Sequence, residues 1–271
     1  MNKYLRLFRF GNGVMGIIGL LVSIFIATGY NMFDQTLNII LGCVIVLAFV
    51  AGGNALNDYI DVEIDRTAHP DRPLPMGEME PRTAQLCGYG GLILAVVLSI
   101  PLGWIAALLV IVCAAMMFGY ETALKQRGFI GNICIAVLTG AVFLFAGSIV
   151  NNFSQVWVLA LLAALVSVGR EIAKDVEDME SDEGSRMTLP MIIGKDRAAL
   201  VAAVFFILGP LLSFIPIING MFGILYATVI VADIIFVYCA VAVRKDAHKA
   251  EKLAKVAMFV ALISFILGVA L

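Results

Sequence analysis

The stretch LGCVIVLAFVAGGNALNDYIDVEID, residues 41–65, joins a long apolar run to a row of acidic residues. A second stretch, VLALLAALVSVGREIAKDVEDMESD at residues 158–182, repeats this arrangement. Apolar runs of this length are typical of helices that cross a membrane. Carboxylates beside an apolar environment are costly unless they have partners. The two stretches therefore predict a membrane protein with a polar site at the ends of two of its helices.

The composition also indicates a membrane protein. Of the 271 residues, 62% are hydrophobic and 14% are charged, whereas soluble domains are about half apolar. Span-length apolar runs recur along the whole chain and leave no room for a soluble domain, so we expect one all-α transmembrane domain over residues 1–271. The basic residues before the first run resemble a signal peptide. Because that run is span-length and no small-residue cleavage site follows, we expect a retained first helix.

Gly, Pro and Asn residues divide the apolar sequence into expected helices. These lie at residues 11–30, 37–56, 84–101, 103–120, 129–149, 155–174, 198–217, 221–243 and 254–271. The stretch 84–120 is too long for one span, and Pro101-Leu102-Gly103 marks a turn within it. Pro216 and Asn219-Gly220 divide the region 198–243 in the same way. The sequence therefore predicts nine transmembrane helices in one bundle.

The basic residues sort to one side of this arrangement. With the N-terminus in the cytoplasm and the loops assigned alternately, the inside segments carry all 18 Lys and Arg residues. These segments are residues 3–9, 66–82, 125–127, 170–197 and 244–255. Cytoplasmic loops of membrane proteins are rich in Lys and Arg. We therefore expect a cytoplasmic N-terminus, an outside C-terminus and both acidic stretches on the cytoplasmic face of the cell membrane.

The acidic residues follow helical spacing in both stretches. If the second helix continues past its apolar run, one stripe consists of Asn54, Asn57, Asp58, Asp61 and Asp65. The stripe on the sixth helix consists of Glu171, Asp175, Asp178 and Asp182. Like charges at these spacings destabilise a bare helix, and such acidic surfaces repel an anionic ligand. Both stripes therefore predict bound Mg²⁺, which hard oxygen ligands hold while positions stay open for phosphate oxygens.

The two motifs resemble the paired aspartate motifs of the UbiA family of intramembrane prenyltransferases. They read Asn57-Asp58-x-x-Asp61-x-x-x-Asp65 and Asp175-x-x-Asp178-x-x-x-Asp182. Supporting marks are Arg72-Pro73-Leu74-Pro75, Tyr120-x-x-x-x-Lys125 and the expected spans, so the resemblance covers essentially the whole chain. Within the family, GNALND at 53–58, LTGAVFLFAG at 138–147 and REIAKDVEDMESD at 170–182 are most like the archaeal members of ether-lipid biosynthesis.

This resemblance implies Mg²⁺-dependent transfer of a geranylgeranyl group from geranylgeranyl diphosphate to the glycerol hydroxyl of geranylgeranylglyceryl phosphate. Ionising an allylic C–O bond builds negative charge on the leaving diphosphate, which metal ions and cationic side chains stabilise. The resemblance assigns one metal site to Asn57, Asp61 and Asp65, and the other to Asp178 and Asp182. The secondary candidates for metal contact are Asp58 and Asp175.

Further residues are expected to contact the substrates. Those expected at the diphosphate are Lys125, Arg72, Lys174 and Tyr120, although Lys174 is equally placed to pair with Asp178 within its helix. The remaining substrate contacts are Asn54, Asn57 and Asp175, with Arg9, Arg72 and Asn12 near an acceptor. Asp233 stands alone in the eighth expected helix, either as a protonated residue of the bundle interior or as part of the acceptor pocket.

The residues leave other functions open. An aromatic acceptor such as 4-hydroxybenzoate would react through a ring carbon at the same motifs. A more remote alternative is a cation transporter, but this predicts several ionisable residues at depth, and only Asp233 is found there. The five cysteines form no CxxC pair, so they support neither a zinc site nor a disulfide framework. Besides the prenyl diphosphate and a lipid-like acceptor, the sequence indicates contact with membrane lipids but no nucleic acid or protein partner.

Overall fold

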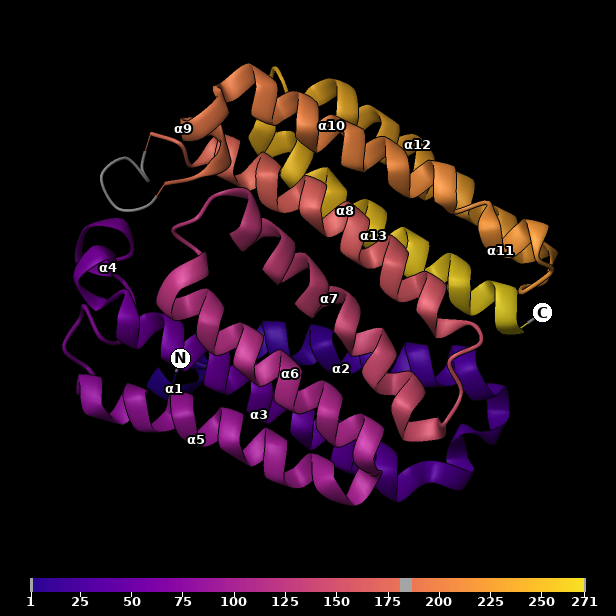
Figure 1. The fold of residues 1–271 in the computed structure, drawn as a ribbon, viewed down its shortest axis with the longest axis horizontal. Coiled ribbons are helices and arrows are strands. Elements are labelled where there is room, and N and C mark those ends of the chain that lie inside the picture. Colours follow the sequence, from indigo (N-terminus) through magenta and orange to yellow (C-terminus); the bar gives the residue numbers. More distant parts are fainter. Residues whose placement is uncertain (1, 181–186, 271) are drawn as a thin grey trace.

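The computed structural model describes residues 2–180 and 187–270 of the chain. Within these ranges the regular structure is helical, apart from an isolated parallel bridge between Arg127 and Met187. Long helices run side by side in one bundle, and the two chain termini lie at its opposite ends (Figure 1). The prediction of an all-α fold is therefore confirmed.

The helices alternate between long apolar rods and short connecting turns. The elements of the first half are α1 (Lys3–Leu7), α2 (Phe10–Thr28), η1 (Gly29–Gln35), α3 (Thr36–Ile60), α4 (Val62–Ala68), α5 (Pro81–Ser99), η2 (Ile100–Leu102), α6 (Trp104–Gly119) and η3 (Tyr120–Leu124). Those of the second half are α7 (Phe129–Val150), α8 (Val156–Glu177), α9 (Leu189–Ile193), α10 (Lys195–Leu212), α11 (Ile215–Ile218), η4 (Ile224–Thr228), α12 (Val229–Ala242) and α13 (Ala247–Ala270).

Eight segments in the described part of the chain are long and apolar enough to cross a membrane. The first of them, Phe10–Ile60, is 51 residues long and contains α2, η1 and α3. The others each include one of the long helices α5, α6, α7, α8, α10, α12 and α13. The protein is therefore a multi-pass membrane protein.

The turn residues in the sequence mark the observed helix boundaries, whereas two helices extend further at their polar ends than the sequence predicts. Gly103 separates η2 from α6 with a φ of 108°, a conformation that only glycine adopts readily. The helix expected to end at residue 56 continues to Ile60, and the helix expected to begin at residue 254 begins at Ala247. Both extensions carry polar or charged residues, so hydropathy alone predicts helices that are too short at these ends.

Two groups of helices build the bundle. Helices α2, α3, α5, α6 and α7 surround one apolar core, and α8, α10, α12 and α13 surround another around the fully buried Phe206. Packing of α7 against α8, and of α13 against α2, joins the two groups. Helix α4, which carries the end of the first acidic stretch, and α9, which follows the second, lie with α1 at one end of the bundle (Figure 1). The fold thus places both acidic stretches at the same end.

Candidate functional site

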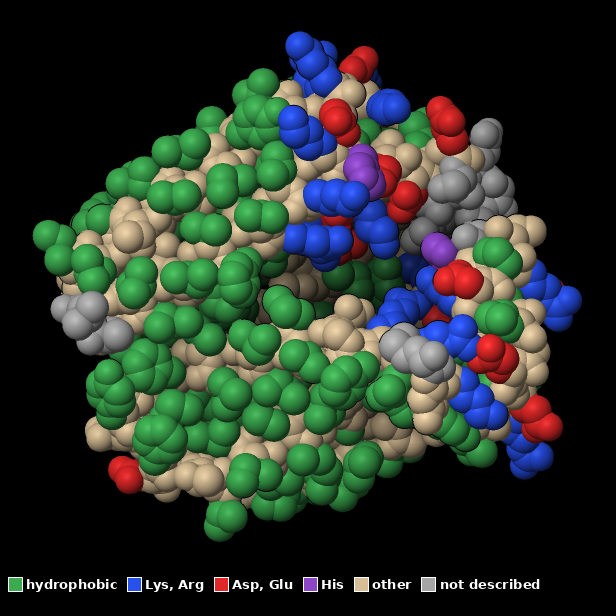
Figure 2. Space-filling model, turned by 180° about the vertical axis from the view of Figure 1, so that it is seen from behind, with side chains coloured by type: hydrophobic (Ala, Val, Ile, Leu, Met, Phe, Trp, Pro, Cys, Tyr) green, Lys and Arg blue, Asp and Glu red, His purple; other side chains and the backbone are tan. Residues whose placement is uncertain are grey.

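A polar cavity of about 620 Å³ lies at this end of the bundle. The predicted site residues that line it are Arg9, Asn12, Asn54, Asn57, Asp61, Asp65, Arg72, Tyr120, Lys125, Lys174 and Asp178. Figure 2 shows the hollow, with Lys and Arg side chains gathered around it and acidic side chains among them. The two acidic stretches, which are far apart in the sequence, therefore face one shared space.

The first acidic stretch does not form one continuous helix. Helix α3 ends at Ile60, and Asp61, with φ −90° and ψ 9°, joins it to α4. The N–H of Asp61 still donates to the carbonyl of Asn57 at 2.9 Å, and the N–H of Asp65 donates to the carbonyl of Asp61 at 2.8 Å. The condition of one continuous helix through the stretch is therefore not met, yet Asn57, Asp61 and Asp65 all line the cavity.

Two arginines neutralise the carboxylates on the inner side of this stretch. Arg9 Nη2 lies 2.7 Å from Asp58 Oδ1 and 2.9 Å from Asn57 Oδ1. Arg72 Nη1 lies 2.5 Å from Asp65 Oδ2 and 3.4 Å from Asp58 Oδ1. Asp58 and Asp65 are only 1% and 3% exposed. Burying a carboxylate without a partner is strongly unfavourable, so the arginines offset the cost of placing both groups in the wall.

A π-helical turn, η3, supplies the facing wall. The N–H of Lys125 donates to the carbonyl of Tyr120 at 3.0 Å, the bond that closes this wider turn. Lys125 Nζ then lies 2.5 Å from Asp61 Oδ1 and 3.0 Å from Glu121 Oε2. The Asn57 amide donates to the same Glu121 oxygen at 3.0 Å. Single π turns are frequent at functional sites. This one contains Tyr120 and Glu121 and is followed directly by Lys125, and all three residues line the cavity.

The end of α8 forms the opposite wall. Lys174 and Asp178 line the polar cavity, and Asp178 caps α8 directly after its last residue, Glu177. Asp175 points to a smaller adjoining pocket, where Asn132 Nδ2 donates to its Oδ2 at 2.9 Å. The predicted ligand Asp182 lies outside the described residues. Of the described aspartates of the second motif, Asp178 therefore lines the polar cavity and Asp175 lines the pocket beside it.

The predicted ligands differ in how they are placed toward the cavity. Asp58 does not line it, because its carboxylate is held by Arg9 and Arg72 within the wall. In the part of the chain that the structure describes, no group of three or more His, Cys, Asp or Glu is arranged to hold a metal ion. The oxygen donors of Asn57 and Asp61 nevertheless line one cavity, and hard oxygen donors of this kind suit Mg²⁺.

Sequence reasoning missed Glu121 as a site residue. Its side chain is 5% exposed and contacts both Asn57 and Lys125. The available signal was an acidic residue at the end of an apolar run, four positions before Lys125, where the two side chains share one helix face. Helical spacing alone does not indicate that this pair turns inward, because the π turn changes the direction in which its side chains point.

A second, largely apolar cavity of about 430 Å³ adjoins the polar one, and Asn12 and Arg170 line both. Its walls come from α2, α7, α8, α10, α12 and α13. Asp233 lies in this wall, and its Oδ2 accepts a hydrogen bond from Ser213 Oγ at 2.8 Å. Asp233 therefore lies in the bundle interior and also lines a pocket, and a part for it in an acceptor site stays a prediction.

Comparison with known proteins gives consistent results over the whole chain. The model of the UbiA prenyltransferase family matches residues 16–263. Digeranylgeranylglyceryl phosphate synthase of Methanosphaera stadtmanae is 40% identical over 99% of both chains. The same enzyme of Thermococcus kodakarensis is 39% identical over 93% of this chain and 92% of its own.

Solved structures agree with the sequence relatives. A structure of digeranylgeranylglyceryl phosphate synthase, 34% identical, superposes with a TM-score of 0.86 over 99% of this chain and 98% of its own. A UbiA homologue of Archaeoglobus fulgidus bound to DMAPP and Mg²⁺ is 16% identical, with a TM-score of 0.72 over 97% and 99% of the two chains. With its fold and near-full-length relatives, the chain belongs to the UbiA prenyltransferase family.

Proposed function

We propose that this protein transfers a geranylgeranyl group from geranylgeranyl diphosphate to the glycerol hydroxyl of geranylgeranylglyceryl phosphate in archaeal ether-lipid biosynthesis. The main support is the polar cavity, which is lined by both acidic motifs and adjoins an apolar cavity. Relatives that are 39% and 40% identical over nearly the whole chain carry the corresponding synthase name. In the reaction the allylic C–O bond to the diphosphate breaks, an ether C–O bond forms, and the hydroxyl proton is released.

We propose Mg²⁺ as the cofactor, held between the two motifs. The residues assigned to it are Asn57, Asp61 and Asp65 on one side and Asp178 and Asp182 on the other, with Asp58 and Asp175 as orienting groups or further ligands. The donor set supports this assignment, because carboxylate and amide oxygens are the ligands that Mg²⁺ takes. When bound, the metal neutralises charge that develops on the leaving diphosphate.

The cationic side chains of the cavity are proposed to bind the diphosphate. Lys125 and Arg72 now contact Asp61 and Asp65, and a bound metal would take over those carboxylates and leave the two cations for phosphate oxygens. Lys174 on the opposite wall is assigned the same role, and Tyr120 is assigned to steady the ionising carbon or the diphosphate. Donors that are already in position stabilise developing charge without reorganising.

The remaining predicted contacts are assigned to substrate at the inner end of the cavity. Arg9 and Asn12 lie at the start of α2, and Asn54 lies on α3. Asn54 Nδ2 donates to the Phe8 carbonyl at 3.2 Å, which ties the segment before Arg9 to α3. We propose that these residues orient the acceptor beside the donor, where correct positioning contributes strongly to rate.

We also propose that residues 1–271 form a single domain with nine spans, a cytoplasmic N-terminus and the active site on the cytoplasmic face. The 51-residue apolar segment supports two spans, because the two helices within it, α2 and α3, pack antiparallel to each other. Gly13 faces Leu47, whereas Leu20 faces Gly42. The sorting of all 18 Lys and Arg residues supports the orientation, and the termini at opposite ends of the bundle agree with an odd number of spans (Figure 1).

The proposed function is tested by incubating purified protein with labelled geranylgeranyl diphosphate and one of two acceptors, with and without EDTA. We expect an ether product from geranylgeranylglyceryl phosphate with Mg²⁺ and none with EDTA. Product from 4-hydroxybenzoate alone would favour the aromatic reaction instead. Metal flux into proteoliposomes without any loss of prenyl diphosphate would favour transport. Absence of EDTA-sensitive product from either acceptor would contradict the whole proposal.

A further inference from the structure

We infer that the apolar cavity holds the isoprenoid chain of the acceptor lipid, and that Arg170 and Lys255 at its polar end bind the acceptor phosphate. This inference rests on the proposed function, and it assigns a separate place to one of the two substrates. It adds Lys255, a residue of α13 outside both aspartate motifs, to the residues that recognise substrate.

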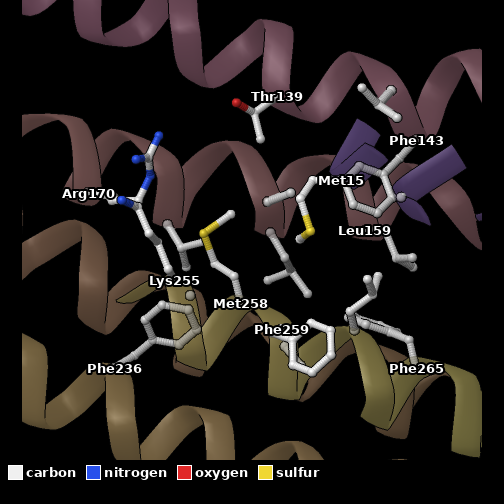
Figure 3. A pocket seen from close by; sticks show the side chains of 18 of the residues that line it. Met15, Thr139, Phe143, Leu159, Arg170, Phe236, Lys255, Met258, Phe259 and Phe265 are labelled. Atoms are coloured by element: carbon white, nitrogen blue, oxygen red, sulfur yellow. The ribbon is translucent and has the colours of Figure 1, made fainter. Parts of the chain in front are cut away.

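The apolar cavity has the form of a site for an amphiphile. Arg170 and Lys255 lie at one end, and the apolar side chains of Phe143, Leu159 and Phe265 lie at the other (Figure 3). Along α8, the distance from Arg170 to Leu159 is roughly 16 Å at the helical rise of 1.5 Å per residue. A ligand with an anionic head and a long hydrocarbon chain matches this separation of charge from apolar surface.

A buried carboxylate fixes the two cations in place. Glu251 is 6% exposed, and its Oε1 lies 2.7 Å from Lys255 Nζ and 3.2 Å from Arg170 Nη1. Arg170 also pairs with Glu171. An arginine has five N–H donors and a lysine has three, so both cations keep donors beyond these bonds. A phosphate monoester, with its negative charge and several acceptor oxygens, is the group that such donors bind best.

The position of the cation pair also suits the reaction. Arg170 and Asn12 line both cavities, so a phosphate bound at Arg170 lies where the apolar and polar cavities meet. The glycerol attached to that phosphate then extends toward the polar cavity that is assigned to the donor diphosphate. The acceptor hydroxyl is thereby brought to the donor without its chain crossing the charged wall.

A lipid can reach this cavity from the membrane. Met15 on α2 and Phe259 on α13 both line it, and they are 54% and 49% exposed. Exposed apolar side chains within a spanning segment face the hydrocarbon of the bilayer, because that surface is not in contact with water. The cavity therefore has an apolar border through which a chain already dissolved in the bilayer enters sideways.

The test separates acceptor binding from donor binding. Lys255→Met removes the charge of a side chain that is 59% exposed, so folding should be retained. We expect its acceptor KM to rise about tenfold or more, as a lost charged hydrogen bond implies, while its donor KM stays unchanged. Lys255→Arg should restore the acceptor KM. The control is Lys252→Met, a change at an exposed residue of α13 that lines no described cavity.

Two further measurements make the outcome decisive. Wild type should prefer geranylgeranylglyceryl phosphate to geranylgeranylglycerol, which lacks the phosphate, and Lys255→Met should lose this preference. Binding of the labelled phosphate lipid should persist in EDTA, because the cations contact it directly, and should weaken in Lys255→Met. An unchanged acceptor KM and affinity, or a rise in donor KM instead, would overturn the inference. Binding through Lys255 without product would support this site and contradict the proposed function.

Discussion

The ammonium of Lys125 lies 2.5 Å from the carboxylate of Asp61, and the pair links two segments that are 64 residues apart. The lysine side chain is 7% exposed and the aspartate side chain 18% exposed. Removing one partner of a charge pair at this depth is strongly destabilising, because the other charge is left buried and unpaired. It therefore ties the π turn to the junction of α3 and α4, and it places a cation beside the first acidic motif before any substrate arrives.

Lys125→Met is expected to lower kcat by about 10²-fold or more, the typical cost of removing one preorganised donor from developing charge. It should also lower the Tm, because Asp61 and Glu121 lose their shared cation. Lys125→Arg keeps the charge and should retain the Tm and part of the activity. Thermal unfolding in detergent and steady-state kinetics measure the two effects. Full turnover in Lys125→Met would remove this residue from the diphosphate site.

Asp61→Asn should abolish most Mg²⁺-dependent turnover while the protein remains folded in the membrane. The loss is expected to exceed about 10²-fold, since a catalytic metal contributes several kcal/mol to stabilising charge in the transition state. The matched control is Glu63→Gln on α4, whose carboxylate is 75% exposed and pairs only with Arg66 among the described contacts. Equal activities of the two variants over a Mg²⁺ titration would argue against a metal at Asp61.

Gly91→Ala is expected to destabilise the protein through the packing of α3 on α5. A Cβ on Gly91 would lie 2.7 Å from Gly52 Cα and 2.8 Å from the Ala48 carbonyl oxygen. These are backbone atoms, so the helices would have to separate, at a cost of about 1–3 kcal/mol. Gly90→Ala on the same helix meets nothing within 4 Å, and it should leave the Tm unchanged or raised. A Tm for Gly91→Ala no lower than that of Gly90→Ala would contradict this packing.

Much of this arrangement was predictable from the sequence because its strongest signals are local. Hydropathy and turn residues predicted helices close to their observed bounds, including the break at Gly103. Helical spacing predicted that Asn57 and Asp65 share a face, and they line the same cavity. The break at Asp61 was not predictable, because acidic residues on both sides of the junction continue the same helical spacing without a proline or glycine.

Other features depend on contacts between distant segments, and local patterns do not specify them. In the sequence Lys255 is one of several basic residues of an expected cytoplasmic segment. It contacts Glu251 one turn earlier on α13, and the packing of α13 against α8 brings this pair to Arg170. The apolar cavity is likewise formed by six helices. The family resemblance makes Asp58 a secondary candidate for metal contact, and the fold buries it against Arg9. Its role as a metal ligand stays a prediction.

Glu121→Gln is expected to weaken Mg²⁺-dependent activity although Glu121 belongs to neither aspartate motif. Its Oε2 accepts hydrogen bonds from both the Asn57 amide and Lys125 Nζ, each at 3.0 Å. The neutral amide keeps the size of the side chain but holds Lys125 less tightly, since hydrogen bonds to a charged group are worth about 1.5–3 kcal/mol. Asn57 and Lys125 should then be less well positioned, and the Mg²⁺ concentration for half-maximal activity should rise.

The readout for Glu121 must separate positioning from folding. Glu121→Gln should shift the Mg²⁺ titration with little change in Tm, whereas Glu121→Ala should also lower the Tm by leaving buried donors without an acceptor. Asp196→Asn, at a carboxylate that is 84% exposed and distant in sequence, is the control for loss of one negative charge. If Glu121→Gln and Asp196→Asn reach half-maximal activity at the same Mg²⁺ concentration, the Glu121 side chain contributes only to packing of the cavity wall. A shift confined to Glu121→Gln means that this carboxylate sets the geometry of Asn57 and Lys125 for metal and diphosphate.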